Sequence, residues 1–287
     1  MSDLVVITGC SSGIGHAIAL EFAKKGYKVI AGARRLDPMK DLIEYGVEIV
    51  KLDVTKMEDI QSLKDLIESK YDSKVKYLFN NAGQPCTFPA ADVKDEDMKQ
   101  CYEVNVFGCI RLTRELMNYI INTKGTIGFT GSVSALAPFP FSAIYSSTKA
   151  AIHSYANTLA FELEPFDVKV INIVTGGVKT NIADVRPLYP DSRYQVEGIE
   201  LVMDKRREMA VRNNPMTAEE YSRKVVHDFE TSKLGVVNRY RGKMASFFWF
   251  ASIFIPRFVL LRAFRKRFAL TDLWATLRKL VSKRKLE

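Results

Sequence analysis

Tyr145 and Lys149 are the two residues of this sequence that are best suited to acid–base chemistry. They stand four positions apart in Tyr145-Ser-Ser-Thr-Lys149, a spacing that puts both on one face of a helix. A phenol is a weak acid with an unperturbed pKa of ~10. A neighbouring ammonium stabilises the phenolate, so that the proton becomes transferable nearer neutral pH. Ser132, thirteen residues upstream, adds a hydroxyl that can hold a carbonyl beside the phenol.

A glycine turn near the start of the chain is suited to a different task. Gly9, Gly13 and Gly15 follow directly on the apolar run Leu4–Thr8 and precede a helical pattern. Glycines at such a junction let the backbone approach a pyrophosphate, and the helix N-terminus offers free N–H groups. With strand and helix on either side, the turn indicates a dinucleotide site. Its members Ser11, Ser12 and Ile14 are predicted to contact the same cofactor.

The next predicted strand ends in Ala33-Arg34-Arg35. A site for NAD prefers an acidic residue here, which accepts hydrogen bonds from the adenine ribose. Ala33 cannot do so, whereas the arginines supply forked cations that suit a 2′-phosphate. We therefore expect NADP(H).

The glycine turn also spells G-x-S-x-G, the pattern of a hydrolase nucleophile elbow with Ser11 as the nucleophile. Such an enzyme needs an acid and then a histidine downstream. The three histidines are His16, His153 and His227, and none stands in an evident catalytic loop. A lipase or esterase is the weaker alternative.

These residues need a framework of strands and helices to bring them together. Apolar, β-branched runs alternate with helical patterns, which predicts a doubly wound α/β fold with one parallel sheet covered on both faces. The expected strands are Leu4–Thr8, Lys28–Ala33, Glu48–Leu52, Tyr77–Asn80, Gly125–Thr130 and Lys169–Val174. The clearest helical patterns are Ile14–Lys25, Met57–Ser69 and Thr148–Leu163. We expect one domain over residues 1–240, in which the polar stretch 181–235 forms a lid over the carboxyl ends of the strands.

The net charge of +9 is a property of the C-terminal tail. Residues 239–287 hold 13 of the 42 Lys and Arg but only two of the 33 acidic residues. Basic residues interleaved with large apolar ones favour a membrane surface over a nucleic-acid partner. The four cysteines show no metal-ligand pairing, so we expect reduced thiols and no metal. No basic and then apolar leader precedes Leu4, so a cleaved signal peptide is not expected.

Residues 241–287 are predicted to form the membrane anchor. Met244–Ile255 carries no charge, but Pro256-Arg257 interrupts it before Phe258–Leu261. The run is thus too short for a simple span, which needs ~20 mostly apolar residues. Thr271–Leu286 has the pattern of a basic amphipathic helix lying in an interface. Its apolar face is Leu273, Trp274, Leu277, Leu280 and Val281, and its cations are Arg278, Lys279, Lys283, Arg284 and Lys285. Alternatively, the apolar segment covers the protein's own core or a dimer contact.

Together these motifs resemble the short-chain dehydrogenase/reductase family over residues 3–180. The matching positions are Thr8, Gly9, Gly13, Gly15, Asn80, Asn81, Ala82, Gly83, Asn105, Ser132, Tyr145 and Lys149. The resemblance implies that Tyr145 is the general acid, that Ser132 orients the substrate carbonyl, and that Lys149 holds the nicotinamide ribose.

The resemblance also assigns contacts around the cofactor. Asp53 and Val54 are implied at the adenine, Asn80 to Gly83 at the adenosine ribose, and Asn105 at a water of the proton relay. One departure is Thr175-Gly176-Gly177, where the family usually has Pro-Gly. We expect Gly176 to loosen this turn, which leaves the cofactor contacts of Val178 and Thr180 open.

Within the family, residues 82–90, 104–108 and 175–178 and the apolar, basic tail are similar to the fungal reductases of 1-acyldihydroxyacetone phosphate. That likeness implies NADPH-dependent reduction of the ketone to 1-acylglycerol 3-phosphate, for phosphatidic acid synthesis. It also implies a location at lipid droplets and the endoplasmic reticulum membrane, with the active domain facing the cytoplasm. A secondary lipase activity, and a homodimer paired through helices that begin near Asn105 and Tyr145, are further implications.

Other readings of the substrate stay open. A steroid, retinoid or other lipid-ketone reductase is the alternative within the enzyme class. A droplet surface protein that merely keeps the fold is disfavoured by the intact Ser132, Tyr145 and Lys149. A phosphate needs a nearby cation, and the predicted lid offers Arg186, Arg193, Lys205, Arg206, Arg207 and Arg212.

Overall fold

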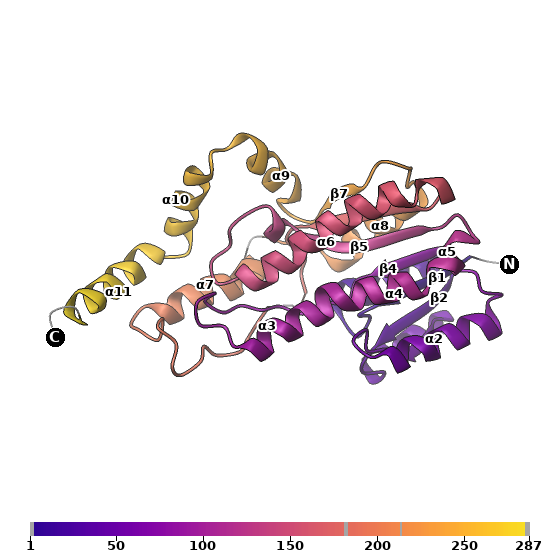
Figure 1. Ribbon diagram of the computed structural model, residues 1–287, viewed down its shortest axis with the longest axis horizontal. Coiled ribbons are helices and arrows are strands. Elements are labelled where there is room, and N and C mark those ends of the chain that lie inside the picture. The colour runs from indigo at the N-terminus through magenta and orange to yellow at the C-terminus, as the bar shows by residue number, and fades with distance from the viewer. Residues whose placement is uncertain (1–2, 181–182, 213, 285–287) are drawn as a thin grey trace.

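The sheet of this protein has seven strands, all parallel, in the order β3-β2-β1-β4-β5-β6-β7 (Figure 1). The structure is a computed structural model, and it describes residues 3–180, 183–212 and 214–284. The strands are β1 (Leu4–Thr8), β2 (Lys28–Ala33), β3 (Glu48–Lys51), β4 (Tyr77–Asn80), β5 (Thr126–Ser132), β6 (Lys169–Thr175) and β7 (Asn238–Arg241).

Helices cover both faces of the sheet because the strands are apolar on both sides. All five residues of β1 are buried, as expected for a parallel strand between two helical layers. One layer consists of α2 (Met57–Lys70), α4 (Cys109–Glu115), α5 (Met117–Ile121) and α6 (Ala143–Glu162). The other consists of α1 (Gly13–Lys24), α8 (Ala218–Glu230) and a 3₁₀ helix over Asp37–Tyr45. The predicted doubly wound fold is confirmed.

The six predicted strands are present; three have the predicted bounds, and the ends of the other three differ by one or two residues. The sequence analysis missed β7, whose four residues Asn-Arg-Tyr-Arg are all only partly buried and form no apolar run. β7 is nevertheless fixed in place, because the Asn172 side-chain amide of β6 donates a hydrogen bond of 2.8 Å to Oδ1 of Asn238. Helix α6 starts five residues before the predicted helix, so that Tyr145 as well as Lys149 lies on it.

The remaining helices gather at the carboxyl end of the sheet, opposite the N-terminus (Figure 1). They are α3 (Asp95–Tyr102), which continues into a π-helical turn over Glu103–Gly108, α7 (Ile199–Arg212), α9 (Ala245–Phe254), α10 (Arg257–Arg267) and α11 (Leu270–Arg284). Two further short 3₁₀ turns lie at Val133–Ala135 and Glu164–Phe166.

A third apolar cluster, which we call the upper cluster, joins the lid and the tail to the end of the sheet. It contains Val133 and Phe139 from the segment after β5, Val202 from α7, and Phe264, Phe268 and Leu273 from the tail. The inner face of the tail therefore packs on the protein itself, as the alternative interpretation proposed. The predicted domain boundary at residue 240 falls inside β7. Across the described residues, every helix is too short or too polar to traverse a bilayer.

Candidate active site

A cavity of about 680 Å³ opens at the carboxyl ends of the strands, the usual place for a ligand in this kind of sheet. Nearly all the residues that sequence reasoning assigned to the cofactor line it. They are Gly9, Ser11, Ser12, Gly13, Ile14, Arg34, Arg35, Asp53, Val54, Asn81, Ala82, Gly83, Tyr145, Lys149 and Thr180. Ala183, Asp184 and Val185 line it from the predicted lid.

The glycine turn has the close contacts that a dinucleotide cradle requires. Gly9 has a φ of 71°, and a Cβ on it would lie 2.8 Å from the Cα of Ala82. A Cβ on Gly15 would lie 2.5 Å from the carbonyl oxygen of Gly9. Larger residues would therefore push the turn, α1 and β4 apart. Gly15 itself faces these neighbours and is not among the residues that line the cavity.

The N-terminus of α1 is electrostatically prepared for an anion. Its first turn contains no acidic residue, and the side chain of the N-cap residue Ser12 makes no capping hydrogen bond. The first N–H groups of the helix have no partner within it, and the positive end of the helix dipole faces the cavity. The turn therefore fits a pyrophosphate.

Arg34 and Arg35 lie at the rim of the same cavity. Ala33 before them is buried, whereas both arginines are exposed. The carboxylate of the same loop, Asp37, is engaged by Lys40 at 2.7 Å. Among the described residues no carboxylate forms an ion pair with either arginine, so both guanidinium groups are available to a 2′-phosphate.

Asn81 ties the ends of three strands together under the cavity. Its amide nitrogen donates to the carbonyl oxygen of Thr8 at 2.9 Å, and its Oδ1 accepts from the Thr130 hydroxyl at 3.1 Å. The side chain of Asn80 points away from the cavity. It is buried beneath α4, where its Nδ2 donates a hydrogen bond of 3.0 Å to the Thr113 hydroxyl. Of the segment Asn80–Gly83, only the last three residues line the cavity, so the prediction for Asn80 as a pocket residue is wrong.

Asp53 is fixed in a local turn that follows β3 and lines the cavity. Its Oδ1 accepts hydrogen bonds from the backbone N–H and the hydroxyl of Thr55, at 3.0 and 2.8 Å. Val54 beside it packs against Gly108, where a Cβ would approach the Val54 side chain to 2.6 Å. Both residues lie at the cavity, and their contacts with an adenine stay a prediction.

Lys149 is buried beside the ring of Tyr145 on α6. Its Nζ lies 5.6 Å from the ring centroid and donates a hydrogen bond of 2.8 Å to the carbonyl oxygen of Thr130. The hydrogen bond to the Thr130 carbonyl oxygen orients the ammonium of Lys149. The remaining N–H donors of this ammonium face the cavity, which Tyr145 and Lys149 both line. The predicted pairing of a phenol with an ammonium on one helical face is present.

Ser132 ends β5 with its hydroxyl already engaged as an acceptor. Its Oγ accepts a hydrogen bond of 3.1 Å from the backbone N–H of Ser134 and one of 2.9 Å from the Ser134 hydroxyl. Because both bonds use acceptor sites, the Ser132 hydroxyl keeps its own proton to donate.

His153 is a site residue that the sequence analysis overlooked. Its Nε2 accepts a hydrogen bond of 3.2 Å from the backbone N–H of Ser132. Burial, reinforced by the charge of Lys149, lowers the pKa of His153 to about 4, so the ring is neutral at physiological pH and Nε2 can accept. A signal did exist, since Tyr145, Lys149 and His153 follow one another at intervals of four on one helical face.

Asn105 joins the loop after β4 to helix α6 from within the π-helical turn. Its Oδ1 accepts from the backbone N–H of Gln84 at 2.8 Å, and its Nδ2 donates to the Gln84 carbonyl at 3.0 Å and the Thr148 hydroxyl at 3.1 Å. π-Helical turns within α-helices are frequent at functional sites. The predicted role of Asn105 in a proton relay stays a prediction.

The turn after β6 is firmly held, contrary to the expectation that Gly176 loosens it. The Thr175 hydroxyl hydrogen-bonds the Tyr221 hydroxyl at 2.6 Å, a contact that proline could not make. The N–H of Gly176 donates to the carbonyl oxygen of Arg241 at 2.8 Å, and a Cβ here would lie 2.2 Å from the Lys243 carbonyl oxygen. Thr180 lines the cavity, whereas Val178 is buried in the core and does not.

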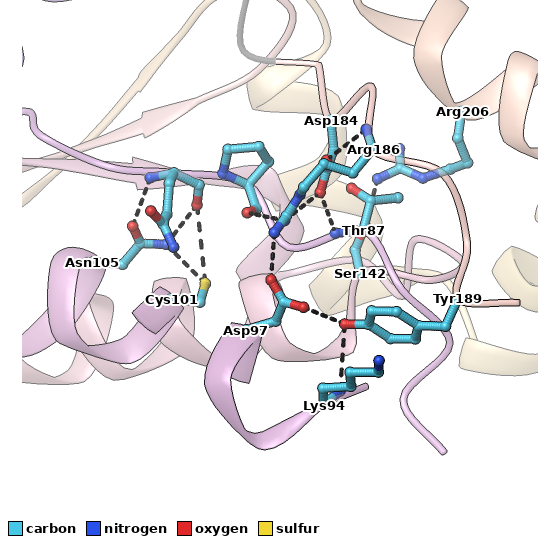
Figure 2. A network of polar contacts seen from close by, with 12 residues as sticks. Thr87, Lys94, Asp97, Cys101, Asn105, Ser142, Asp184, Arg186, Tyr189 and Arg206 are labelled. Carbon is cyan, nitrogen blue, oxygen red and sulfur yellow. Dashed lines mark hydrogen bonds and ion pairs between the residues drawn. The ribbon is translucent and has the colours of Figure 1, made fainter. Parts of the chain in front are cut away.

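Arg186 attaches the lid to the segment after β4 (Figure 2). It binds both carboxylate oxygens of Asp184 at 2.8 Å, one oxygen of Asp97 at 2.5 Å and the carbonyl of Pro85 at 3.2 Å. Tyr189 adds a hydrogen bond to Asp97 and stacks on Phe88 with ring centroids 4.5 Å apart. Two carboxylates thus neutralise Arg186, which removes it from the candidates for a substrate phosphate.

The hydrolase alternative gains no support from the geometry. Ser11 lines the cavity, but none of the three histidines does. His16 faces Asp41 at 3.0 Å, His153 lies behind Ser132, and His227 is exposed on α8. Among the described residues, Ser11 therefore has no base in position to activate it. The four cysteines are buried as free thiols.

Comparison with known proteins agrees with this arrangement. The family model for short chain dehydrogenases matches residues 3–187. The chain is 44% identical over 272 residues, 93% of its length, to an NADPH-dependent 1-acyldihydroxyacetone phosphate reductase of Saccharomyces cerevisiae, of which it covers 91%. A protein of the same description from Schizosaccharomyces pombe is 42% identical over 62% of this chain and 60% of its own. Among solved structures, a short-chain dehydrogenase from Streptomyces avermitilis has a TM-score of 0.72 at 25% identity, over 95% of this chain and 97% of that one.

Proposed function

Because the chain belongs to the short-chain dehydrogenase family, we propose that it is an NADPH-dependent reductase of 1-acyldihydroxyacetone phosphate. The product is 1-acylglycerol 3-phosphate, a precursor of phosphatidic acid. The observation that carries this proposal is the placement of Tyr145 and Lys149 at one cavity with an anion-binding glycine turn, while Ser132 ends the strand β5 that contributes Thr130 to the same cavity. The near full-length similarity to the Saccharomyces cerevisiae enzyme selects the substrate.

Ser132, Tyr145 and Lys149 have different roles in the proposed carbonyl reduction. Bound NADPH supplies the hydride. Ser132 donates its free proton in a hydrogen bond to the substrate carbonyl oxygen and so holds it beside Tyr145. Tyr145 then gives its phenolic proton to that oxygen as negative charge develops there. Lys149, oriented by Thr130, stabilises the phenolate that is left.

The apolar surroundings of Tyr145 suit a ketone that carries an acyl chain. The ring of Tyr145 packs against the upper cluster, which contains Phe139, Leu188 and Val202 besides aromatic residues of the tail. Apolar side chains with a few polar groups are what a lipid-binding site requires. A steroid or retinoid ketone would find the same environment, so the apolar wall by itself does not select among lipid ketones.

A membrane or lipid-droplet surface is the proposed location of the enzyme. The outer face of the tail carries exposed Phe247, Trp249, Phe250, Ile253, Phe254, Phe258, Val259 and Leu261. Large contiguous apolar patches are rare on monomeric soluble proteins, and the cations of α10 and α11 flank this one. On α11 the predicted apolar face is divided, since Leu273 is buried in the upper cluster while Leu280 and Val281 are exposed. We assign the enzyme to lipid droplets and the endoplasmic reticulum membrane, with the active domain facing the cytoplasm.

A homodimer is a second proposed association. The helices that would pair begin near Asn105 and Tyr145, and they expose Phe107 and Phe161. Exposed phenylalanines on neighbouring helices of one layer favour a second copy as the partner.

The assignment is tested by NADPH oxidation with 1-acyldihydroxyacetone phosphate. The full-length wild type is expected to reduce this ketone faster than a steroid or retinoid ketone. Tyr145→Phe should abolish turnover and leave NADPH binding intact, because only the phenolic oxygen is lost. A wild-type enzyme that reduces a steroid but not the acylated phosphate would overturn the choice of substrate.

A further inference from the structure

We propose that Arg206 on lid helix α7 binds the phosphate group of the substrate. This inference rests on the proposed function, because it assumes a ketone that carries a phosphate, and it names the residue that would distinguish that substrate from uncharged lipid ketones.

Arg206 lies where the lid, the catalytic helix and the tail meet. Its guanidinium donates a hydrogen bond to the hydroxyl of Ser142, the residue directly before α6 (Figure 2). The same group lies 5.7 Å from the ring centroid of Phe139 and 5.9 Å from that of Phe268. Two aromatic rings and a serine hydroxyl thus hold the cation in a fixed orientation.

No carboxylate among the described residues compensates the charge of Arg206. Its polar contacts are with Ser142 and with the sulfur of Met209, and its buried Nε has no hydrogen-bond partner in the described part of the chain. Burial lowers the pKa of this guanidinium to about 10, and the nearby Tyr145 partly offsets this effect. A cation removed from water without a partner costs free energy. An anion that enters the site would recover that cost.

The other lid cations are engaged or face solvent. Arg186 is bound by Asp184 and Asp97. Arg207, the next residue on α7, is paired with Asp204 at 3.1 Å. Arg193 is largely exposed and lies 3.6 Å from Asp92. Among the described residues, none forms a contact that directs Lys205 to the site. The side chain of Arg212 is not among the side chains that the structure describes.

The position of Arg206 matches the covalent structure of the substrate. Only one carbon and one oxygen separate the ketone carbon from the phosphorus, so the phosphate must lie in the immediate surroundings of Tyr145. Tyr145 and Ser142 are one helical turn apart at the start of α6. A phosphate beside Ser142 and Arg206 is therefore compatible with a ketone at Tyr145.

The start of α6 reinforces the positive potential at this place. Its first turn has no acidic residue, and the Ser142 side chain makes no capping hydrogen bond but accepts one from Arg206. The Ser142 hydroxyl keeps its own proton for a phosphate oxygen. A planar guanidinium can bind two phosphate oxygens at once, and the unpaired Nε is one of its donors.

The experiment compares binding of 1-hexanoylglycerol 3-phosphate and 1-hexanoylglycerol to the full-length protein loaded with NADP⁺. Wild type is expected to prefer the phosphorylated ligand. Arg206→Met should lower the affinity for that ligand about 10- to 100-fold and leave the affinity for 1-hexanoylglycerol unchanged. The matched control is Arg207→Met on the same helix, which should keep the wild-type preference. If the methionine variant does not fold, Arg206→Gln, which keeps a donor for Ser142 but no charge, replaces it.

The outcomes separate this inference from the proposed function. Absence of a phosphate preference in wild type, or its survival in a folded Arg206 variant, overturns the role of Arg206. Turnover of the two corresponding ketones with NADPH is measured in parallel. If wild type reduces neither ketone, the proposed function fails, while the binding comparison still decides the role of Arg206 because it needs no catalysis.

Discussion

His153 lies directly behind Ser132, and its Nε2 accepts the Ser132 backbone N–H at 3.2 Å. His153 thus holds the end of β5, and with it the backbone of Ser132, in a fixed position. Only the neutral imidazole can do this, because both nitrogens of an imidazolium are donors. Burial and the nearby charge of Lys149 keep the pKa of His153 low, at about 4.

The first prediction concerns stability against pH. The pKa of His153 is about 4 when folded and ~6.5 when unfolded, so the unfolded chain binds more protons between these values. The contribution of His153 to the free energy of unfolding is therefore complete above about pH 6.5 and decreases as the pH is lowered toward 4. His153→Gln, whose amide oxygen can accept the same bond, should remove this contribution.

Urea unfolding at pH 7 and pH 4.5 measures the effect. Between the two pH values wild type should lose about 2.5 kcal/mol more unfolding free energy than His153→Gln. Equal losses in the two proteins would show that His153 is not held neutral by the fold.

The second prediction concerns Lys149. Lys149→Met removes the ammonium beside Tyr145 and the hydrogen bond to the Thr130 carbonyl oxygen. We expect kcat to fall at least about 100-fold and the KM for NADPH to rise, because the same ammonium is predicted to hold the nicotinamide ribose. Steady-state kinetics with a circular dichroism check of folding is the measurement. A variant with near wild-type kcat would exclude Lys149 from catalysis.

The third prediction concerns the choice between NADPH and NADH. Arg34→Ala combined with Arg35→Ala should lower kcat/KM for NADPH about 30-fold or more and change that for NADH little, because only the phosphate contacts are lost. Lys40→Ala is the matched control, since Lys40 is a cation of the same loop that is engaged by Asp37. If the ratio of kcat/KM for NADPH to kcat/KM for NADH is the same in the double variant as in wild type, these arginines do not bind the 2′-phosphate.

Much of the site could be predicted from sequence because its residues follow strands or share a helix. The glycine turn, Arg34, Ser132, Tyr145 and Lys149 all belong to local patterns whose geometry is fixed by the element that carries them. Asn80 was misassigned because successive residues at a strand end point to opposite sides, and its neighbour Asn81 takes the cavity side.

What sequence could not supply depends on contacts between distant segments. β7 has no apolar run and forms only because β6 is there to pair with. To select Arg206 among the six lid cations, one must know which of the other five are paired with carboxylates. Arg186, for example, is paired with Asp97 on α3, which lies 89 residues away in the sequence. The division of the tail into a buried and an exposed face likewise depends on Phe139, which packs against Phe248 and Phe264.

The fourth prediction concerns the exposed face of the tail. Phe250, Phe254 and Phe258 point to solvent, and Phe258 is 71% exposed. Removing the whole tail would also strip Phe264 and Phe268 from the upper cluster, so a deletion cannot separate anchoring from folding. Replacing the three exposed phenylalanines by serine leaves the inner face intact. Since burial of each ring stabilises binding by roughly 1.5–3 kcal/mol, partitioning to lipid vesicles should fall at least about 100-fold.

Flotation with phosphatidylcholine vesicles and with triacylglycerol droplets measures this partitioning. The control replaces Phe166 by serine, because this side chain is exposed outside the tail and is not part of the proposed dimer contact. NADPH binding should be equal in wild type and both variants, which shows that the fold is kept. If the triple variant floats with lipid as wild type does, the outer face of α9 and α10 is not the anchor, and the exposed phenylalanines must serve a contact between protein chains instead.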